Sequence, residues 1–158
     1  QKNFQLLIDA FEIVNNNYDV KLIILGEGYL ELELKKIVKR KKLDKKIKFM
    51  KYTNNVKDIF AISSIFVLSS KFEGFGNVIV ESLLYATPVV STNCKGGPLE
   101  ILCNGKYGII SEQNKYDLSN KMIITIEKII NNEINYQELQ KRALNFSTES
   151  IAVKYLNL

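Results

Sequence analysis

Histidine and tryptophan are absent from this chain of 158 residues, and cysteine, methionine and proline occur twice each. Without histidine the chain lacks the commonest general base and metal ligand, so it cannot assemble a Ser–His or Cys–His nucleophile of its own. Its two cysteines, Cys94 and Cys103, form no Cys-x-x-Cys pair, and we interpret both as packing residues in a cytoplasmic protein. Chemistry carried out by this chain therefore has to use carboxylates, lysines and backbone amides.

Long apolar runs are also missing. No run approaches the roughly 20 apolar residues that span a membrane, and no signal peptide opens the chain. Hydrophobic residues make up 46% of the sequence and charged residues 25%, which is typical of soluble globular proteins. A chain of this length is enough for one domain that buries about 68–70% of the surface of its unfolded state. We therefore expect a single soluble domain over residues 1–158.

The net charge of +5 comes from one segment of the chain. Residues 35–48 contain nine Lys or Arg against a single Asp, whereas the rest of the chain has 13 basic and 16 acidic residues. Such a patch fits anionic lipid or nucleic acid, but the favoured interpretation is a solvated helix face and loop. Because no aromatic residue interleaves with these lysines, nucleic acid is not an expected partner. Peripheral contact with a membrane stays open.

Short apolar runs alternate along the chain with segments whose apolar residues recur every three or four positions. The apolar runs predict strands at 20–25, 47–50, 65–68, 89–91 and 107–110. The periodic segments predict helices at 4–17, 29–41, 56–62, 78–86, 99–102, 118–130 and 136–145, and a last helix through Ile151, Val153 and Tyr155. This alternation indicates an α/β fold with a parallel sheet covered on both faces, whose ligand lies beyond the carboxyl ends of the strands.

The stretch from Ser69 to Glu81 joins a predicted strand to a predicted helix through a glycine-bearing turn. A helix that starts in this way leaves its first backbone N–H groups unpaired, and its N-terminus suits a phosphate. Glu73 lies in the turn, and Glu81 lies in an otherwise apolar helix with Asn77 one turn earlier on the same face. A buried carboxylate needs a polar partner, such as a sugar hydroxyl. The residues alone leave a second interpretation open, in which Glu73 only favours the helix start and Glu81 faces solvent.

Two further glycine turns follow predicted strands. Gly26-Glu27-Gly28 has the start of a dinucleotide fingerprint, but Glu31 stands where the third glycine is required. No GxxxxGK[ST] sequence is present, which excludes a P-loop. Gly96-Gly97-Pro98 precedes a predicted helix and either presents N–H groups to an anion or makes a tight turn. The sequence therefore does not predict an NAD site or a P-loop.

Taken together, these stretches resemble the "group 1" family of retaining glycosyltransferases, which have the GT-B fold. The signature of this family is a pair of glutamates separated by seven residues, which Glu73 and Glu81 match. The other matching stretches are Ser69-Ser70, Gly74-Phe75-Gly76-Asn77, Ala86 to Thr92, Gly96 to Ile101, and Phe146-Ser147 with Ile151 and Tyr155. The resemblance implies a Rossmann-like doubly wound parallel sheet that forms the C-terminal, donor-binding half of a GT-B enzyme.

The resemblance also implies roles for individual residues. Glu73 would contact hydroxyls of the donor sugar, and Lys2 would neutralise the diphosphate as it leaves, so these two would be catalytic. Glu81 would hold the ribose hydroxyls of the nucleotide. The remaining donor-binding positions would be the backbone of Gly74, Phe75, Gly76, Asn77 and Val78, the base site near Met50 and Tyr52, and the neighbouring turn at Gly26.

By the same resemblance, the parent enzyme would transfer a hexose or N-acetylhexosamine from a nucleotide-sugar, expected to be a UDP-sugar, to a glycan or lipid-linked acceptor. It would need no metal or other cofactor, and it would work in the cytoplasm, with peripheral contact at the inner membrane face left open. The N-terminal acceptor domain, the first strand of this domain and the Arg that pairs with Lys2 would all be missing here. This chain alone is therefore not expected to be a working catalyst.

Lys51 departs from the family pattern, because it stands where the family usually has glycine, next to the expected base site. Two interpretations without catalysis remain as alternatives. One is a Rossmann-like nucleotide-binding module, and the other is a basic domain that binds anionic surfaces through residues 35–48.

Overall fold

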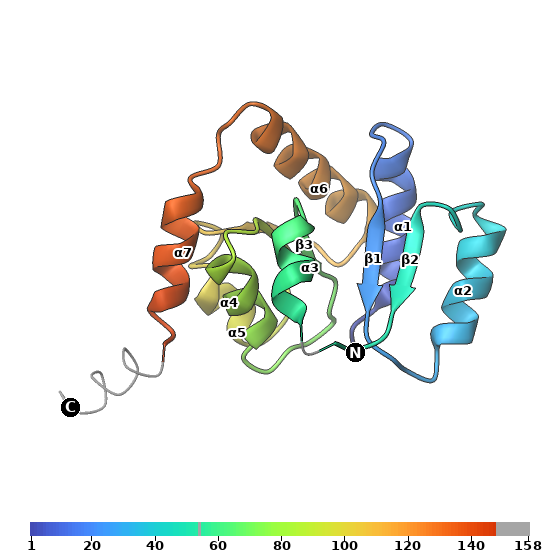
Figure 1. Ribbon diagram of the computed structural model, residues 1–158, viewed down its shortest axis with the longest axis horizontal. Helices are drawn as coiled ribbons and strands as arrows, with labels where there is room; N and C mark the ends of the chain where they lie inside the picture. Colours follow the sequence, from blue (N-terminus) through green and yellow to red (C-terminus); the bar gives the residue numbers. More distant parts are fainter. Residues whose placement is uncertain (54, 148–158) are drawn as a thin grey trace.

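The computed structural model describes residues 1–53 and 55–147, in which helices and strands alternate along the chain (Figure 1). The strands are β1 (Leu22–Leu25), β2 (Ile47–Met50), β3 (Phe66–Leu68), β4 (Val89–Thr92) and β5 (Ile109–Ser111). The helices are α1 (Phe4–Asn15), α2 (Glu31–Arg40), α3 (Val56–Ile62), α4 (Asn77–Leu84), α5 (Gly97–Ile101), α6 (Lys115–Ile130) and α7 (Tyr136–Leu144). The predicted alternation is confirmed. The helix predicted through Ile151 and Tyr155 lies outside the described residues.

All the strand pairs in the described residues are parallel, and they form two sheets. One sheet joins β1 to β2, with Leu25 opposite Met50, and the other has the order β3-β4-β5, with Leu68 opposite Ser91. Every residue of β4 is buried, because this strand lies between two others and is covered on both faces. The carboxyl ends of β3 and β4 therefore lie side by side, which brings the loops after them together.

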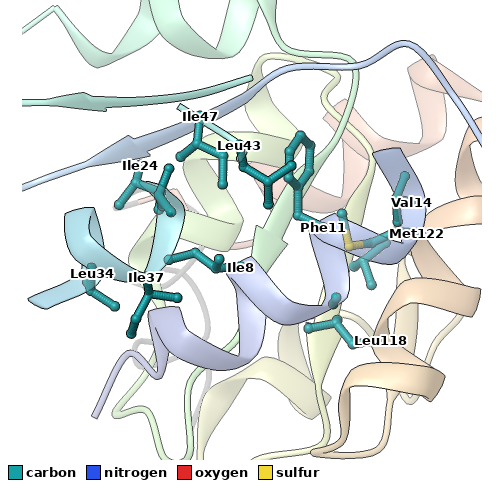
Figure 2. Packing of buried hydrophobic residues seen from close by; sticks show 13 residues of the cluster. Ile8, Phe11, Val14, Ile24, Leu34, Ile37, Leu43, Ile47, Leu118 and Met122 are labelled. Carbon is teal, nitrogen blue, oxygen red and sulfur yellow. The ribbon is translucent and has the colours of Figure 1, made fainter. Parts of the chain in front are cut away.

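Two hydrophobic clusters hold the layers together. The first joins α1, α2 and α6 to the β1-β2 sheet; Figure 2 shows Val14 of α1 next to Met122 of α6, and the ring of Phe11 near Leu43. The spacing of three or four residues between the buried positions of α1 is the pattern that predicted this helix. The second cluster packs α4, α5 and α7 against β3 and β4, and it includes Ile79. This second cluster holds the two elements, β3 and α4, that the next loop connects.

A cavity of about 720 Å³ lies between the two sheets. It is lined by all of β1 and β3 and by apolar side chains from the surrounding helices, among them Phe11 of α1, Phe60 of α3 and Met122 of α6. No backbone hydrogen bond between described residues joins β1 to β3. Each of these two strands therefore presents an unpaired edge to an apolar cavity, an arrangement that proteins rarely leave uncovered.

Candidate functional site

The loop between β3 and α4 presents a row of free amides. Gly76 precedes the first residue of α4 and has φ +89°, a backbone conformation that favours glycine. Among the described residues, no backbone N–H from Gly74 to Val78 donates a hydrogen bond, and α4 has no side-chain cap. Such consecutive donors at a helix N-terminus form an anion-binding concavity. The sequence-based prediction that these amides are unpaired is confirmed.

A second loop, which follows β4, packs directly against this one. The Glu73 amide donates to the Lys95 carbonyl at 3.2 Å, and the Gly97 amide donates to the Gly74 carbonyl at 2.7 Å. A Cβ atom on Gly96 would lie 1.8 Å from the Glu73 carbonyl oxygen, so only glycine permits this approach. Helix α5 begins at Gly97, before the predicted start at residue 99. The Gly97 amide is therefore already used within the protein and is not presented to an anion. The second loop instead supports the first.

Glu73 and Lys2 meet at the carboxyl end of β3. The Lys2 Nζ lies 2.9 Å from the Glu73 Oε2, and Ser70 donates its hydroxyl to the same oxygen at 3.0 Å. The side chain of Glu73 is 12% exposed and that of Lys2 is 47% exposed. The carboxylate is therefore shielded from solvent and stabilised by one cation and one hydroxyl. The structure brings together the two residues that were predicted to be catalytic.

Glu81 and Asn77 are both exposed on α4. Glu81 lies in the second turn of the helix, and no side-chain hydrogen bond or ion pair of this residue is found among the described residues. The carboxylate thus avoids a desolvation cost by facing solvent, which is one of the two outcomes that the sequence left open. It remains free to accept hydrogen bonds from a ligand.

The other predicted donor residues form a separate pair of loops. The Gly26 amide donates to the Met50 carbonyl at 2.9 Å, and the Lys51 Nζ lies 3.4 Å from a carboxylate oxygen of Glu27. Tyr52 is 68% exposed. No hydrogen bond or ion pair in the described part of the chain links these loops to the Glu73 loop. Both pairs nevertheless follow the carboxyl ends of parallel strands, where a ligand of this fold class lies.

The family model "Glycosyl transferases group 1" matches residues 1–146. The chain belongs to this family. Among curated relatives, the group 1 domain is 38% identical over 111 residues to a Campylobacter jejuni enzyme, the N-acetylgalactosamine-N,N'-diacetylbacillosaminyl-diphospho-undecaprenol 4-alpha-N-acetylgalactosaminyltransferase. That alignment covers 70% of this chain and 30% of the relative.

Two solved structures show the same arrangement as the group 1 domain. A mutant of Staphylococcus aureus TarM, in complex with fondaparinux, alpha-GlcNAc-glycerol and UDP, is 27% identical with a TM-score of 0.88, covering 99% of this chain and 32% of TarM. Anabaena HepE in complex with UDP is 25% identical with a TM-score of 0.84, covering 99% of this chain and 46% of HepE. The fold is that of the Rossmann-like C-terminal domain of GT-B glycosyltransferases. The chain spans less than half the length of the curated relatives that it matches, and less than half of the TarM and HepE chains.

The two cysteines of the group 1 domain differ in their surroundings. Cys94 is buried beside the site, where burial raises the pKa of its thiol and the negative charge of Glu73 raises it further. Cys103 is exposed and has φ +48°. The interpretation of Cys103 as a packing residue is therefore wrong, because the chain turns outward at the end of α5.

Residues 1–53 and 55–147 contain no cluster of three or more His, Cys, Asp or Glu that could hold a metal ion. Within the same described ranges, no helix is both long enough and apolar enough to cross a membrane.

Sequence reasoning assigned no role to several residues that shape the site. Ser69 and Ser70 contact Lys2 and Glu73, and Thr92 donates to the Ser70 carbonyl at 2.7 Å. Gln113 bridges the two loops through bonds of 3.1 Å to the Lys71 and Asn93 carbonyls. The available signal was a run of polar residues directly after buried strands, which in a parallel sheet places hydroxyls at the ligand edge.

Proposed function

We propose that this domain binds the nucleotide-sugar donor of a retaining glycosyltransferase that uses a UDP-sugar. The observation that carries the proposal is the row of unpartnered amides from Gly74 to Val78, which begins directly after one member of the Lys2–Glu73 ion pair. Helix-terminal amides and a lysine together suit a diphosphate, because both neutralise its charge. The neighbouring carboxylate suits the hydroxyls of a sugar, because an ionised carboxylate only accepts hydrogen bonds.

Each predicted residue takes a defined part in this proposal. Glu73 binds the sugar hydroxyls, and Lys2 binds the diphosphate. Glu81 accepts hydrogen bonds from the ribose, which its exposed and unpartnered carboxylate allows. The base lies against the loops at Gly26, Met50 and Tyr52, where the side chain of Lys51 is turned toward Glu27.

The proposed reaction breaks the bond between the anomeric carbon of the sugar and the diphosphate oxygen. The acceptor hydroxyl attacks the same face of that carbon, and its proton passes to the departing phosphate oxygen. Negative charge therefore develops on the diphosphate, where the Lys2 ammonium and the amides of Gly74 to Val78 are already in place to stabilise it. These residues supply the stabilisation without a metal ion.

The relatives support a sugar nucleotide and suggest acceptor classes. Both TarM and HepE have been solved with UDP bound, and the TarM complex also contains alpha-GlcNAc-glycerol. The name of the Campylobacter jejuni relative specifies an N-acetylgalactosaminyl group and a diphospho-undecaprenol acceptor. On this basis we assign the transferred group to hexoses or N-acetylhexosamines, and the acceptor to glycans or lipid-linked glycans.

The proposal includes parts of the enzyme outside this chain. The acceptor binds in an N-terminal domain, and the cavity between β1 and β3 receives a further parallel strand that runs into Gln1. The main chain before α1 already forms a hydrogen bond with the residues that follow β3, because the Lys71 amide donates to the Gln1 carbonyl at 2.9 Å. A strand in the cavity followed by α1 and β1 would form a parallel β-α-β unit, the usual crossover of such sheets.

Contact with a cytoplasmic membrane surface also belongs to this proposal. Lys36, Lys39 and Arg40 are exposed on α2 and form no ion pair with another described residue. Tyr29, just before the same helix, and Leu32, in its first turn, are 95% and 74% exposed. Basic residues beside exposed apolar side chains are typical of surfaces that bind anionic lipid.

The experiment that tests the donor site is a calorimetric titration of the protein with UDP, GDP, ADP and NAD, repeated on Glu81→Ala. We expect saturation by UDP and its loss in the variant. Glu33→Ala is the matched control, because Glu33 is also an exposed helical glutamate but lies on α2. At a UDP concentration 100 times its dissociation constant, the unfolding free energy should rise by about 2.7 kcal/mol.

Binding of UDP that is equally strong in Glu81→Ala would remove the role assigned to Glu81. Saturation by NAD with no response to any nucleoside diphosphate would favour the non-catalytic nucleotide-binding module instead. If the protein is folded and binds none of the four, the titration is repeated on the full-length protein. Failure there would overturn the donor-site proposal itself.

A further inference from the structure

Two consecutive serines directly after β3 hold the two members of the Lys2–Glu73 ion pair. Ser69 and Ser70 are 3% and 0% exposed. The Ser69 hydroxyl donates to the Lys2 carbonyl at 2.7 Å, and the Ser70 hydroxyl donates to the Glu73 Oε2 at 3.0 Å. One serine thus fixes the main chain that carries the lysine, and the other fixes the carboxylate.

The support for these serines comes from the neighbouring strand. Thr92, the last residue of β4, donates its hydroxyl to the Ser70 carbonyl at 2.7 Å and lies 3.3 Å from the Leu68 carbonyl. Thr92 is fully buried, as is Ser70. Side chains whose own positions are fixed by buried hydrogen bonds to a strand hold a site more tightly than side chains on free loops. Ser70 is therefore a rigid donor toward a carboxylate that lies on a loop.

The two oxygens of the Glu73 carboxylate are used differently. Oε2 accepts hydrogen bonds from both Ser70 and Lys2, whereas Oε1 has no hydrogen-bond partner among the described residues. Two donors on one oxygen fix the rotation of the carboxylate about its last bond. The other oxygen is then presented in a defined direction, and a hydroxyl of a bound molecule can donate to it.

We propose that Ser70 is a positioning residue, which holds Oε2 of Glu73 so that Oε1 faces the hydroxyls of the donor sugar. This inference rests on the donor-site function proposed above. Ser70 does not touch the sugar, and its effect passes through Glu73. Losing this bond leaves the ion pair with Lys2 in place but frees the carboxylate to rotate, which lowers the fraction of complexes with the reactive geometry.

The test measures turnover and donor KM of the full-length protein with Ser70→Ala, Glu73→Gln and the double variant. We expect Ser70→Ala to lower kcat about tenfold and to change KM by less than about twofold. In the Glu73→Gln background, Ser70→Ala should have no further effect on kcat, since the carboxylate that it positions is gone. If Ser70 had a purely structural role, Ser70→Ala would instead lower kcat by the same factor in the wild-type protein and in Glu73→Gln.

Ser82→Ala is the matched control. Ser82 is also fully buried, and its hydroxyl donates a single bond of 3.0 Å, to the Thr87 carbonyl beyond the end of α4. The Ser82→Ala variant should lose about as much unfolding free energy as Ser70→Ala, but its kcat should stay unchanged. A kcat of Ser70→Ala equal to that of Ser82→Ala, or additive effects in the double variant, would overturn the positioning role. If Glu73→Gln itself keeps full turnover, the proposed function fails, and not only this inference.

Discussion

Lys2 and Glu73 are 71 positions apart in the sequence, and their charged groups lie 2.9 Å apart at the end of β3. Glu73 is held in a loop between β3 and α4, whereas Lys2 precedes α1, so the ion pair joins the first residues of the chain to its central loop. The lysine has three donors and uses one of them here. It can therefore keep its bond to Glu73 while it binds a phosphate oxygen.

Replacing Glu73 by Gln should reduce turnover of the full-length protein about a hundredfold and change UDP affinity by less than about threefold. The reason is that Glu73 contacts the transferred sugar of the donor in our proposal, and UDP does not carry that sugar. Lys2→Met should instead weaken UDP binding as well as turnover, with Lys71→Met as control because Lys71 is exposed and forms no ion pair in the described part of the chain. Equal losses of turnover and UDP affinity in Glu73→Gln would contradict the assignment.

The glycines of the two site loops should respond differently to alanine. Gly96→Ala would place Cβ 1.8 Å from one carbonyl oxygen and 2.6 Å from another, at φ +119°, and should cost about 3 kcal/mol of unfolding free energy or more. Gly74→Ala meets no atom within 4 Å and should leave stability nearly unchanged while weakening UDP binding, because its Cβ would point into open space beside the free amides.

Denaturant unfolding combined with calorimetry measures both effects. Gly28→Ala is the control for the stability measurement, since a Cβ there also meets nothing within 4 Å. A Gly96→Ala variant as stable as wild type would show that the two loops do not pack as described.

The ion pairs between Lys41 and helix α1 predict a pH dependence of stability. The Lys41 Nζ lies 2.8 Å from Asp9 and 2.6 Å from Glu12. Burial of Asp9 raises its pKa, but the hydrogen bonds from Lys41 and Gln5 outweigh this, so the pKa of Asp9 lies below its ordinary value of 3.8. The hydrogen bonds to Asp9 and Glu12 raise the pKa of Lys41 above 10.5.

A lowered carboxyl pKa stabilises the fold above the value in the unfolded chain, and this contribution is lost as the pH falls below about 4. A raised lysine pKa acts in the opposite direction, so its contribution is lost as the pH rises above about 10.5. Lys41→Met should therefore lower the unfolding free energy by about 1 kcal/mol at pH 7, and the difference from wild type should shrink toward pH 3. Lys45→Met is the control, and a difference that is independent of pH would contradict this account.

The basic face of α2 should bind anionic vesicles. We expect the triple variant Lys36→Gln, Lys39→Gln and Arg40→Gln to bind phosphatidylserine-containing vesicles roughly a hundredfold more weakly, since each charge near the surface contributes about 1 kcal/mol. A variant with the same change in net charge, in which Lys57, Lys128 and Lys141 become Gln, is the control, because these exposed lysines lie on other helices. If sedimentation shows that vesicle binding weakens equally in both variants, the basic face of α2 is not a specific membrane-binding surface.

Filling the cavity between β1 and β3 should stabilise the domain. A version extended by the further strand that we propose before Gln1 should unfold at a higher denaturant concentration, with a larger m-value because more surface is buried. An extension of the same length made of Gly and Ser is the control. If both extensions leave the midpoint unchanged, the cavity is not the site of a further strand.

The order of the elements could be predicted from the sequence because it depends on local patterns. The spacing of three to four residues between apolar positions in α1 reflects one buried stripe along the helix. The adjacent apolar residues Val89 and Val90 at the start of β4 reflect a strand that is buried on both faces. The predictions were less accurate at element ends. β5 begins at Ile109 and α5 at Gly97, because packing against neighbouring loops sets those boundaries. Cys103 was assigned to the interior although it is exposed.

The candidate site was only partly determined by the sequence. The Glu73–Glu81 spacing, the glycine turn and the unpaired amides of Gly74 to Val78 are local features, and together with the family resemblance they predict a ligand site from the sequence. Only the tertiary structure showed that Lys2 reaches Glu73, that Ser69 and Ser70 hold this pair, and that Gly96 must be glycine. Apart from the Ser70–Glu73 bond, which lies within one loop, these contacts join residues that are far apart in the sequence. Their distances depend on how the parallel strands pair rather than on any pattern along the chain.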